Sequence, residues 1–210
     1  TLFPYTTLFR SGKTGALLQM KAGILAMQGA YHKHRAIMES LGFDAVEVRE
    51  PHELSSVNGL IIPGGESTVM VKLLARNGIM DILKSRILEG MPVFGTCAGM
   101  ILLSREIEGM DQPTLGVMDI AVKRNAYGRQ IESFEAKLEI SGVEGGPFPG
   151  VFIRAPKIVS TGKDVEVLSE FESVPVLVRQ GNMLAASFHP ELTVDRRIHE
   201  LFASMIKQAL

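Results

Sequence analysis

The chain contains one cysteine, Cys97, and its surroundings predict a nucleophile. It lies in Gly95-Thr96-Cys97-Ala98-Gly99, where an apolar strand ends in a glycine-flanked turn and a helical pattern begins. Small residues on both sides allow a sharp turn, so the side chain projects from the end of the sheet. The partial positive charge at the amino end of a helix favours the thiolate, the reactive form of cysteine. This turn therefore predicts covalent chemistry by a thiolate.

A second motif, His189-Pro190-Glu191, also follows an apolar strand. The imidazole of His189 can take the thiol proton, and the carboxylate of Glu191 can orient the ring through its other nitrogen. The alternative is that Cys97 is a small buried core residue and that His189 and Glu191 are ordinary loop residues. Because both motifs close an apolar strand, we favour a Cys-His-Glu triad of Cys97, His189 and Glu191.

The segment Pro63-Gly64-Gly65-Glu66-Ser67 predicts an oxyanion hole. Two glycines after a strand allow a backbone N–H to face a substrate oxygen, and the N–H of Ala98 is aimed at the same place. Taken alone, the segment is slightly better explained as a strand-to-helix loop with Ser67 as the helix N-cap. The two interpretations are compatible, and we assign the oxyanion hole to Gly65 and Ala98.

The elements that must position these motifs follow an alternating pattern from Met20 onwards. Short, uniformly apolar segments that alternate with helical ones are typical of a parallel sheet covered by helices. We expect strands at 22–27, 45–48, 60–62 and before Cys97, and helices at 31–41, 68–75, 80–89 and about 194–209. Beyond Gly116, alternating segments predict antiparallel additions at 134–140, 151–154, 165–169 and 174–178.

Composition limits the class of protein. With 210 residues, 46% hydrophobic content and a net charge of -1, the chain can bury the core of one α/β domain. The charge distribution does not predict nucleic-acid binding, and no apolar run approaches the roughly 20 residues that span a bilayer. A single cysteine leaves no internal disulfide and no CxxC pair, which indicates a reducing compartment, the cytoplasm.

Residues 1–19 do not fit the pattern that follows them. They lack a starting methionine and precede Met20, so we expect a non-native, disordered leader at 1–19 and one domain at 20–210. Gly12-Lys13-Thr14 imitates the end of a phosphate-binding loop, but that motif requires glycine where Thr7 stands. Nucleotide binding is therefore not expected there.

The remaining histidines and methionines predict no further site. No metal and no cofactor is expected, because the other histidines are not spaced with cysteine or carboxylates as zinc ligands are: His32, His34, His52 and His199. Most of the eleven methionines, such as Met100 and Met183, fall in apolar segments and are expected to fill the core.

Together the three motifs resemble the class I glutamine amidotransferases, whose triad has this chain order. Further segments resemble the glutaminase subunits of pyridoxal 5'-phosphate synthase, and the resemblance covers Met20 to Leu210. These segments are Leu25-Ala26-Met27-Gln28-Gly29-Ala30, Arg124-Asn125-Ala126-Tyr127-Gly128-Arg129-Gln130, Ser133-Phe134-Glu135 and Val151-Phe152-Ile153-Arg154-Ala155-Pro156.

The resemblance implies a fold, a reaction and a partner. The implied fold is a three-layer, flavodoxin-like α/β class I glutamine amidotransferase fold, with a mostly parallel central sheet and antiparallel additions. The implied reaction is hydrolysis of L-glutamine to L-glutamate and ammonia, with ammonia passed to the synthase subunit that makes pyridoxal 5'-phosphate, or vitamin B6. Implied glutamine contacts are Gly65, Glu66, Ser67, Arg124, Ile153 and Arg154. A guanidinium suits the substrate α-carboxylate because it donates two parallel hydrogen bonds.

One departure from the family and two alternative functions remain. Lys33 stands where the family commonly has glutamate, which reverses a charge near the expected docking region of the synthase subunit. The alternatives are another cysteine hydrolase or amidotransferase subunit on the same fold, and a catalytically silent assembly subunit. A silent subunit should have lost a triad residue, and a different amidotransferase should lack the segments at 124–130 and 151–156. All of these are present.

Overall fold

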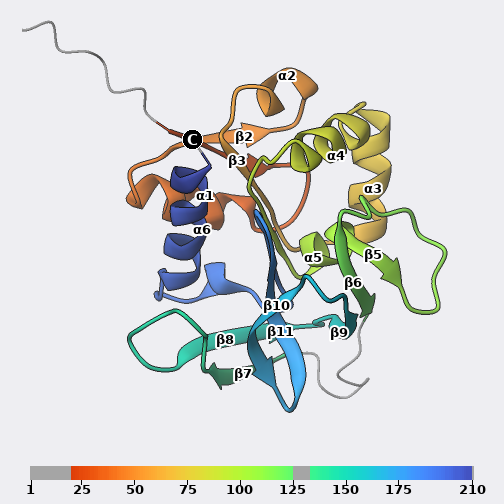
Figure 1. Ribbon diagram of the computed structural model, residues 1–210. Helices are drawn as coiled ribbons and strands as arrows, with labels where there is room; N and C mark the ends of the chain where they lie inside the picture. Colours follow the sequence, from red (N-terminus) through yellow and green to blue (C-terminus); the bar gives the residue numbers. More distant parts are fainter. Residues whose placement is uncertain (1–19, 125–132, 210) are drawn as a thin grey trace, which may run out of the picture.

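A seven-stranded sheet forms the centre of the computed structural model, which describes residues 20–124 and 133–209 (Figure 1). The order of its strands is β10-β11-β12-β4-β3-β1-β2. Their bounds are β1 Lys21–Leu25, β2 Asp44–Val48, β3 Gly59–Ile62, β4 Val93–Thr96, β10 Glu166–Phe171, β11 Val174–Gln180 and β12 Met183–Ala186. The leader predicted at 1–19 and the segment 125–132 lie outside the described residues, so the domain boundary stays a prediction.

The sheet is parallel from β12 to β2 and antiparallel at its other edge. Strands β12, β4, β3, β1 and β2 pair in parallel, whereas β11 is antiparallel to both β12 and β10. The order β2-β1-β3-β4-β12 is the flavodoxin-like order of doubly wound sheets. All residues of β3 and β4 are buried, as expected for parallel strands covered on both faces. The predicted fold class is confirmed.

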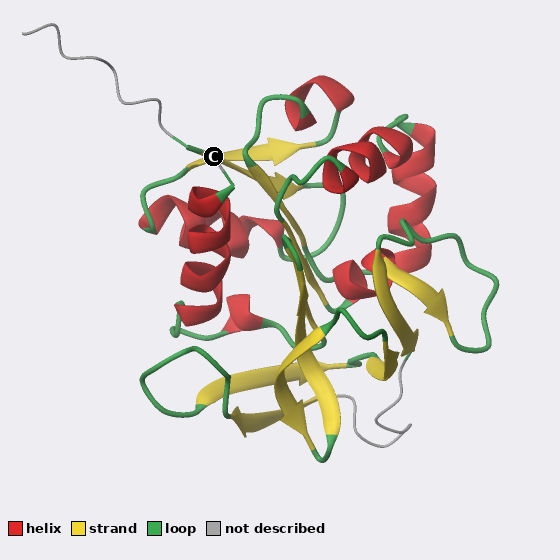
Figure 2. Ribbon diagram, viewed as in Figure 1, coloured by secondary structure: helices red, strands yellow, loops and turns green. Residues whose placement is uncertain are grey.

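Helices cover both faces of the sheet and complete three layers (Figures 1 and 2). On one face lie α1 Tyr31–Ser40 and α6 Arg197–Gln208, and on the other lie α3 Ser67–Arg76, α4 Met80–Leu88 and α5 Ala98–Leu103. The short helix α2, Pro51–Leu54, follows β2. In α6, the residues Ile198, Phe202, Met205 and Ile206 are buried at helical spacing, so one stripe of the helix faces the sheet.

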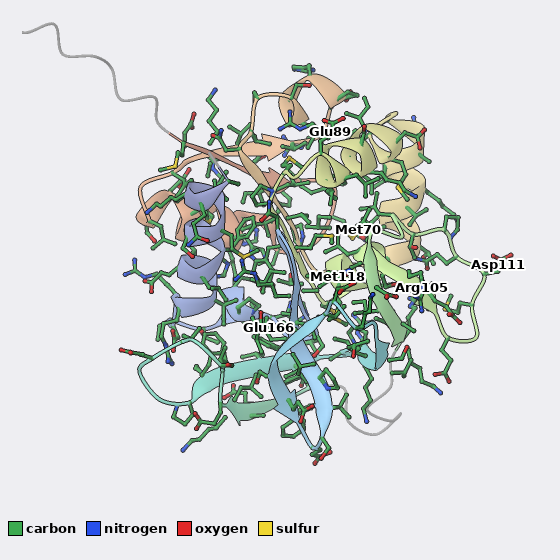
Figure 3. All side chains as sticks on the ribbon, in the orientation of Figure 1. Met70, Glu89, Arg105, Asp111, Met118 and Glu166 are labelled. Atoms are coloured by element: carbon green, nitrogen blue, oxygen red, sulfur yellow. The ribbon has the colours of Figure 1, made fainter. Side chains whose placement is uncertain are left out.

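Each face of the sheet has its own apolar core. Phe94 and Phe202 belong to the core under α1 and α6, whereas Met70, Met100 and Met118 belong to the core under α3, α4 and α5. Met70 and Met118 are labelled in Figure 3 and are fully buried. Met100 is buried, as the sequence predicted, and the partly buried Met183 packs against the same core.

Two smaller sheets lie beside the central one. One contains β5 Ser104–Ile107, β6 Met118–Lys123 and β9 Lys157–Thr161, and the other is the antiparallel pair β7 Ser133–Leu138 and β8 Phe148–Ile153. The sequence did not predict the first sheet. Strand β8 begins three residues before the predicted start because Pro149-Gly150 lies within a two-stranded sheet, where each strand is an edge that tolerates proline.

The last helix begins later than the sequence predicted. Residues Pro190–Leu192 form a 3₁₀ turn, and the Asp195 carboxylate accepts the backbone N–H of Arg197 at 3.1 Å. Helix α6 therefore begins at Arg197, and the residues from Val194 to Arg196 lead into it. Among the described residues, no helix combines the length and apolar character needed to cross a bilayer.

The parallel strands bring the predicted motifs to one edge of the sheet. Thr96 at the end of β4 is paired with Ala186 at the end of β12, and Gly95 is paired with Ile62 at the end of β3. The backbone N–H of Cys97 donates to the carbonyl of Ala186 at 2.8 Å. Because the carboxyl ends of parallel strands meet at one edge, the segments that follow β1, β3, β4 and β12 converge there.

We expect Gly99→Ala to reduce stability strongly, because α5 packs directly on the backbone of β3. A Cβ at Gly99 would lie 2.0 Å from the carbonyl oxygen of Ile62, which is backbone and cannot move aside. The expected loss of unfolding free energy is about 3 kcal/mol in urea titrations.

Gly42→Ala is the control for this substitution. Gly42 has a φ of 86° and open space where its Cβ would lie, so alanine there costs only backbone strain, about 1 kcal/mol. Equal losses for the two variants would contradict the proposed steric cause.

Candidate active site

Cys97 sits in a strained turn between β4 and α5. Its backbone has φ 49° and ψ -104°, a conformation that non-glycine residues rarely adopt, and it occupies the N-cap position of α5. Small neighbours make the turn possible, since a Cβ at Gly95 would lie 2.6 Å from the backbone of Gly99. Cys97 is buried, with 8% of its surface exposed. The sharp turn is as the sequence predicted.

His189 and Glu191 lie on the turn that follows β12. The backbone N–H of His189 donates to the carbonyl of Val151 at 2.8 Å, which ties this turn to β8. The 3₁₀ turn then directs the Glu191 side chain back beneath the ring, and its Oε1 lies 2.8 Å from His189 Nδ1. The Glu191 side chain is fully buried. A buried carboxylate at this distance holds the ring in one orientation.

His189 and Glu191 each stabilise the charged form of the other. Burial opposes the charged form of His189, but hydrogen bonds with Cys97 and Glu191 outweigh it and raise the pKa of His189 to about 10. Burial likewise opposes the carboxylate, but the hydrogen bond from His189 outweighs it and lowers the pKa of Glu191 to about 2. At neutral pH an imidazolium therefore lies between the sulfur and a carboxylate.

Gly64 packs against both halves of this group. A Cβ at Gly64 would lie 2.5 Å from His189 Cε1 and 3.5 Å from Cys97 Cβ. The structure thus brings Cys97 and His189 together from positions 92 residues apart (189 − 97). Their catalytic roles stay a prediction at this point.

A cavity of about 430 Å³ opens at this edge of the sheet. It is lined by every residue for which the sequence predicted a role in the site: Gly65, Glu66, Ser67, Cys97, Ala98, Arg124, Ile153, Arg154, His189 and Glu191. Gln28, Gly29, Ala30, Gly64 and Ile101 complete the lining. The volume suits a small polar substrate rather than a polymer.

The loop after β3 is held in place by the segment after β1. The side-chain oxygen of Gln28 accepts the backbone N–H of Glu66 at 2.9 Å. A Cβ at Gly29 would lie 1.8 Å from the carbonyl oxygen of Gly64, so only glycine allows this approach. The sequence reasoning missed the role of Gln28, although its position after an apolar strand placed it at the same edge.

The expected cap of α3 is corrected by one residue. Ser67 was predicted as the N-cap, but α3 begins at Ser67 and its N-cap is Glu66. Glu66 accepts the backbone N–H of Thr68 at 3.5 Å and its hydroxyl at 3.0 Å. Ser67 is instead buried and donates to Gln112 Oε1 at 3.3 Å.

Glu66 and Arg124 form an ion pair at the wall of the cavity. Arg124 Nη2 lies 2.6 Å from Glu66 Oε1, and the other guanidinium nitrogen lies 3.4 Å from Gln112 Oε1. Burial opposes ionisation of Glu66, but the hydrogen bonds from Thr68 and the charge of Arg124 lower its pKa. A carboxylate and a guanidinium side by side match the two charges of a free amino acid.

Ile153 and Arg154 reach the cavity from the end of β8. Cys97 Sγ lies 3.9 Å from the carbonyl oxygen of Ile153. Arg154 has a φ of 43°, a strained value for a residue with a side chain, and it is exposed. The bond between His189 and Val151 holds this strand end over the thiol.

Two further histidines, His34 from α1 and His199 from α6, lie behind Glu191 and were not predicted to belong to the site. Both are fully buried, and His34 Nε2 lies 3.3 Å from Glu191 Oε2. Burial lowers the pKa of His34 to about 4 and that of His199 to about 3. In residues 20–124 and 133–209, no group of three or more His, Cys, Asp or Glu side chains is arranged to hold a metal ion.

The sequence matches the SNO glutamine amidotransferase family over residues 24–208. The chain belongs to this family. It is 53% identical over 189 residues to the pyridoxal 5'-phosphate synthase subunit PdxT of Thermosipho africanus, covering 90% of this chain and 100% of that protein. It is 54% identical over 183 residues to the PdxT of Pelotomaculum thermopropionicum, covering 87% and 93%.

Two solved structures share this fold. A crystal structure of a glutamine amidotransferase matches with a TM-score of 0.85 and 49% identity, covering 89% of this chain and 98% of that one. The structure of PurLQS from Thermotoga maritima shares the fold, with a TM-score of 0.60 and 17% identity, covering 91% and 97%.

We expect the two buried neutral histidines to weaken the fold in mild acid. Their pKa values are lowered from 6.5 to about 4 and about 3, so below pH 6.5 the unfolded chain binds protons that the folded chain does not. The stability they contribute is present above pH 6.5 and is lost as pH falls towards their folded pKa values. Each should cost about 2 kcal/mol between pH 7 and pH 5.

The measurement is urea unfolding at pH 7 and pH 5 for the parent and His199→Phe. This variant removes one of the two groups, so about half of the loss should disappear. A loss of the same size in both proteins would show that His199 does not contribute to it.

Proposed function

We propose that this chain hydrolyses L-glutamine to L-glutamate and ammonia through Cys97, His189 and Glu191. The ammonia would pass to the synthase subunit that makes pyridoxal 5'-phosphate. One observation supports this most directly: in a member of the glutamine amidotransferase family, Cys97 and the His189–Glu191 pair meet in one cavity from the ends of adjacent parallel strands.

In the first half of the reaction, the Cys97 thiolate attacks the side-chain amide carbon of glutamine. The raised pKa of His189 keeps its proton on the ring until the leaving group needs it. The carbon–nitrogen bond then breaks, His189 gives this proton to the departing ammonia, and a glutamyl thioester with Cys97 remains.

In the second half, water hydrolyses the thioester. The imidazole, now neutral, accepts a proton from the water, and the oxygen attacks the thioester carbon. The carbon–sulfur bond breaks, glutamate leaves, and the thiolate and imidazolium are restored. Glu191 keeps the ring in the same orientation for both proton transfers through its 2.8 Å contact with Nδ1.

The oxyanion of each tetrahedral intermediate would bind the backbone N–H groups of Gly65 and Ala98. Both residues line the cavity beside Cys97. Gln28 supports this role from behind, because its bond to the N–H of Glu66 fixes the peptide chain next to Gly65. Fixed donors of this kind stabilise charge without reorganising during the reaction.

Substrate recognition would use the Glu66–Arg124 pair. The guanidinium of Arg124 suits the α-carboxylate of glutamine, and the carboxylate of Glu66 suits its α-ammonium group. The pair thus offers both charges of the substrate a partner, while Ser67, Ile153 and Arg154 close the cavity around the side chain.

The partner and compartment follow from the family. The relatives at 53% and 54% identity are subunits of pyridoxal 5'-phosphate synthase, which favours this assembly over another amidotransferase. A silent subunit is disfavoured because all three triad side chains are present and adjacent. We place the protein in the cytoplasm, where a single free thiol remains reduced.

Cys97→Ala tests the nucleophile. We expect weak glutamate release by the parent chain alone, stronger release with the synthase subunit, and a loss of about 10³-fold or more in the variant under both conditions. Glutamate is measured by a coupled enzymatic assay. Undiminished release by the variant would exclude the thiolate mechanism, and an unchanged parent rate with added synthase subunit would argue against the proposed assembly.

Arg124→Met tests the recognition of the α-carboxylate. Loss of a charge-assisted hydrogen bond of about 1.5–3 kcal/mol should raise KM about 10- to 100-fold, with a smaller change in kcat. Arg105→Met is the matched control, because Arg105 pairs with Asp119 on β6 and does not line the cavity. Equal KM values for the two variants would exclude the assigned role of Arg124.

A further inference from the structure

A line of buried imidazoles continues behind the catalytic pair into the protein. His189 Nδ1 lies 2.8 Å from Glu191 Oε1, and the other carboxylate oxygen, Oε2, lies 3.3 Å from His34 Nε2. His34 Nδ1 lies in turn 2.9 Å from His199 Nε2. The three elements that meet here are the turn after β12, helix α1 and helix α6.

The order of donors along this line is determined by its carboxylate end. An ionised carboxylate only accepts, so the proton of His34 must be on Nε2, and its Nδ1 must be an acceptor. His199 must then carry its proton on Nε2 in order to donate to His34. This leaves His199 Nδ1 as a bare acceptor, and that atom is buried with no hydrogen-bond partner among the described residues.

The opposite arrangement, with the protons of His34 and His199 on Nδ1, is much less favourable. It would place a lone pair of His34 against the carboxylate, and it would bury the N–H of His199 Nδ1 without an acceptor. An unmet buried donor costs considerably more than an unused acceptor. Both rings are neutral at neutral pH because burial lowers their pKa values, so the line carries no second positive charge.

We propose that His34 is a positioning residue of the triad: its Nε2–H holds the second carboxylate oxygen of Glu191, and His199 fixes the tautomer of His34 that makes this possible. This inference rests on the proposed function, because it concerns how the same triad is oriented. His34 and His199 do not line the cavity, so neither is assigned contact with substrate.

The need for such a residue follows from where Glu191 is mounted. It lies on a three-residue 3₁₀ turn, and its Oε2 is buried without a hydrogen bond among the described residues, with His34 Nε2 as a neighbouring nitrogen at 3.3 Å. Without His34 the carboxylate could rotate about its side chain and present a poorer angle to His189. A neutral donor suits this place better than Lys or Arg, because a cation would compete with the imidazolium for the carboxylate charge.

The contact of His34 with β4 links this line to the nucleophile as well. His34 Nε2 lies 3.5 Å from the hydroxyl oxygen of Thr96, the residue before Cys97. His199 packs edge-on against Phe94 of the same strand, with ring centroids 6.0 Å apart. The two histidines therefore rest on the strand that carries the thiol, so the carboxylate and the sulfur are positioned by one set of contacts.

The experiment measures the thiolate directly. Cys97 is the only cysteine of the chain, so the rate of alkylation by iodoacetate, followed by mass spectrometry, reports on this residue alone. Iodoacetate is an anion that the imidazolium attracts, so its rate falls at the basic limit at which His189 loses its proton. The titratable groups around that proton are Cys97, Glu191, His34 and His199, with Glu66, Arg124 and Arg154 on the cavity side.

Two variants of His34 separate positioning from packing. In His34→Gln, the amide nitrogen can donate to Glu191 and the amide oxygen can accept from His199, so the line is rebuilt. In His34→Leu, both contacts are lost. We expect the Leu variant to lower kcat for glutamine about tenfold with KM within about twofold, and to move the basic limit of alkylation down by about one pH unit. The Gln variant should stay close to the parent in both measurements.

Every outcome decides the proposal. It is overturned if the Leu variant keeps the kcat and alkylation profile of the parent, or if Gln and Leu lose kcat equally with unchanged alkylation profiles. If His34→Leu does not fold, His199→Leu replaces it, since that variant removes only the donor that fixes the tautomer. We expect a smaller shift in the same direction, and no shift overturns the proposal. A parent that alkylates as expected but releases no glutamate would instead refute the proposed function.

Discussion

The pairing of β4 with β12 is the constraint on which the site depends. These strands lie far apart in the sequence, yet their parallel register sets Thr96 opposite Ala186 and allows the Cys97 N–H to donate to the Ala186 carbonyl. Each strand then ends at the same edge, one with the thiol and the other with the turn that carries His189. A shift of one residue in this register would point every side chain of β12 to the opposite face.

Electrostatics at this edge result from a competition between burial and hydrogen bonding. Burial alone would favour the neutral forms of His189 and Glu191, but their mutual contact and the neighbouring sulfur outweigh the effect of burial. For His34 and His199, which lie behind this pair, the effect of burial is the largest one, so their pKa values are lowered and both rings remain neutral. The result is a charged pair beside the cavity with uncharged imidazoles on its inner side. This division suits the acid–base role proposed for His189, because such a residue must both hold and release a proton.

Close backbone packing makes room for this arrangement. A Cβ at Gly64 would collide with the His189 ring, one at Gly29 with the carbonyl of Gly64, and one at Gly99 with the carbonyl of Ile62. Part of the cavity wall is therefore closely packed main chain. Fixed donors stabilise a developing oxyanion more effectively than donors that must first reorient. The strain at Cys97 is held by the same packing.

The sequence by itself determined the triad candidates, the glycine loop, the α/β class and most of the parallel strands, because these signals are local: a short motif at the end of an apolar run. It missed the sheet of β5, β6 and β9, the role of Gln28, and the capping of α3 by Glu66. Only the tertiary structure placed Arg124 beside Glu66 and His199 beside His34, 165 residues away in the chain. The second contact depends on how α1 and α6, from opposite ends of the chain, pack on one face of the sheet, and no local pattern of residues predicts that packing.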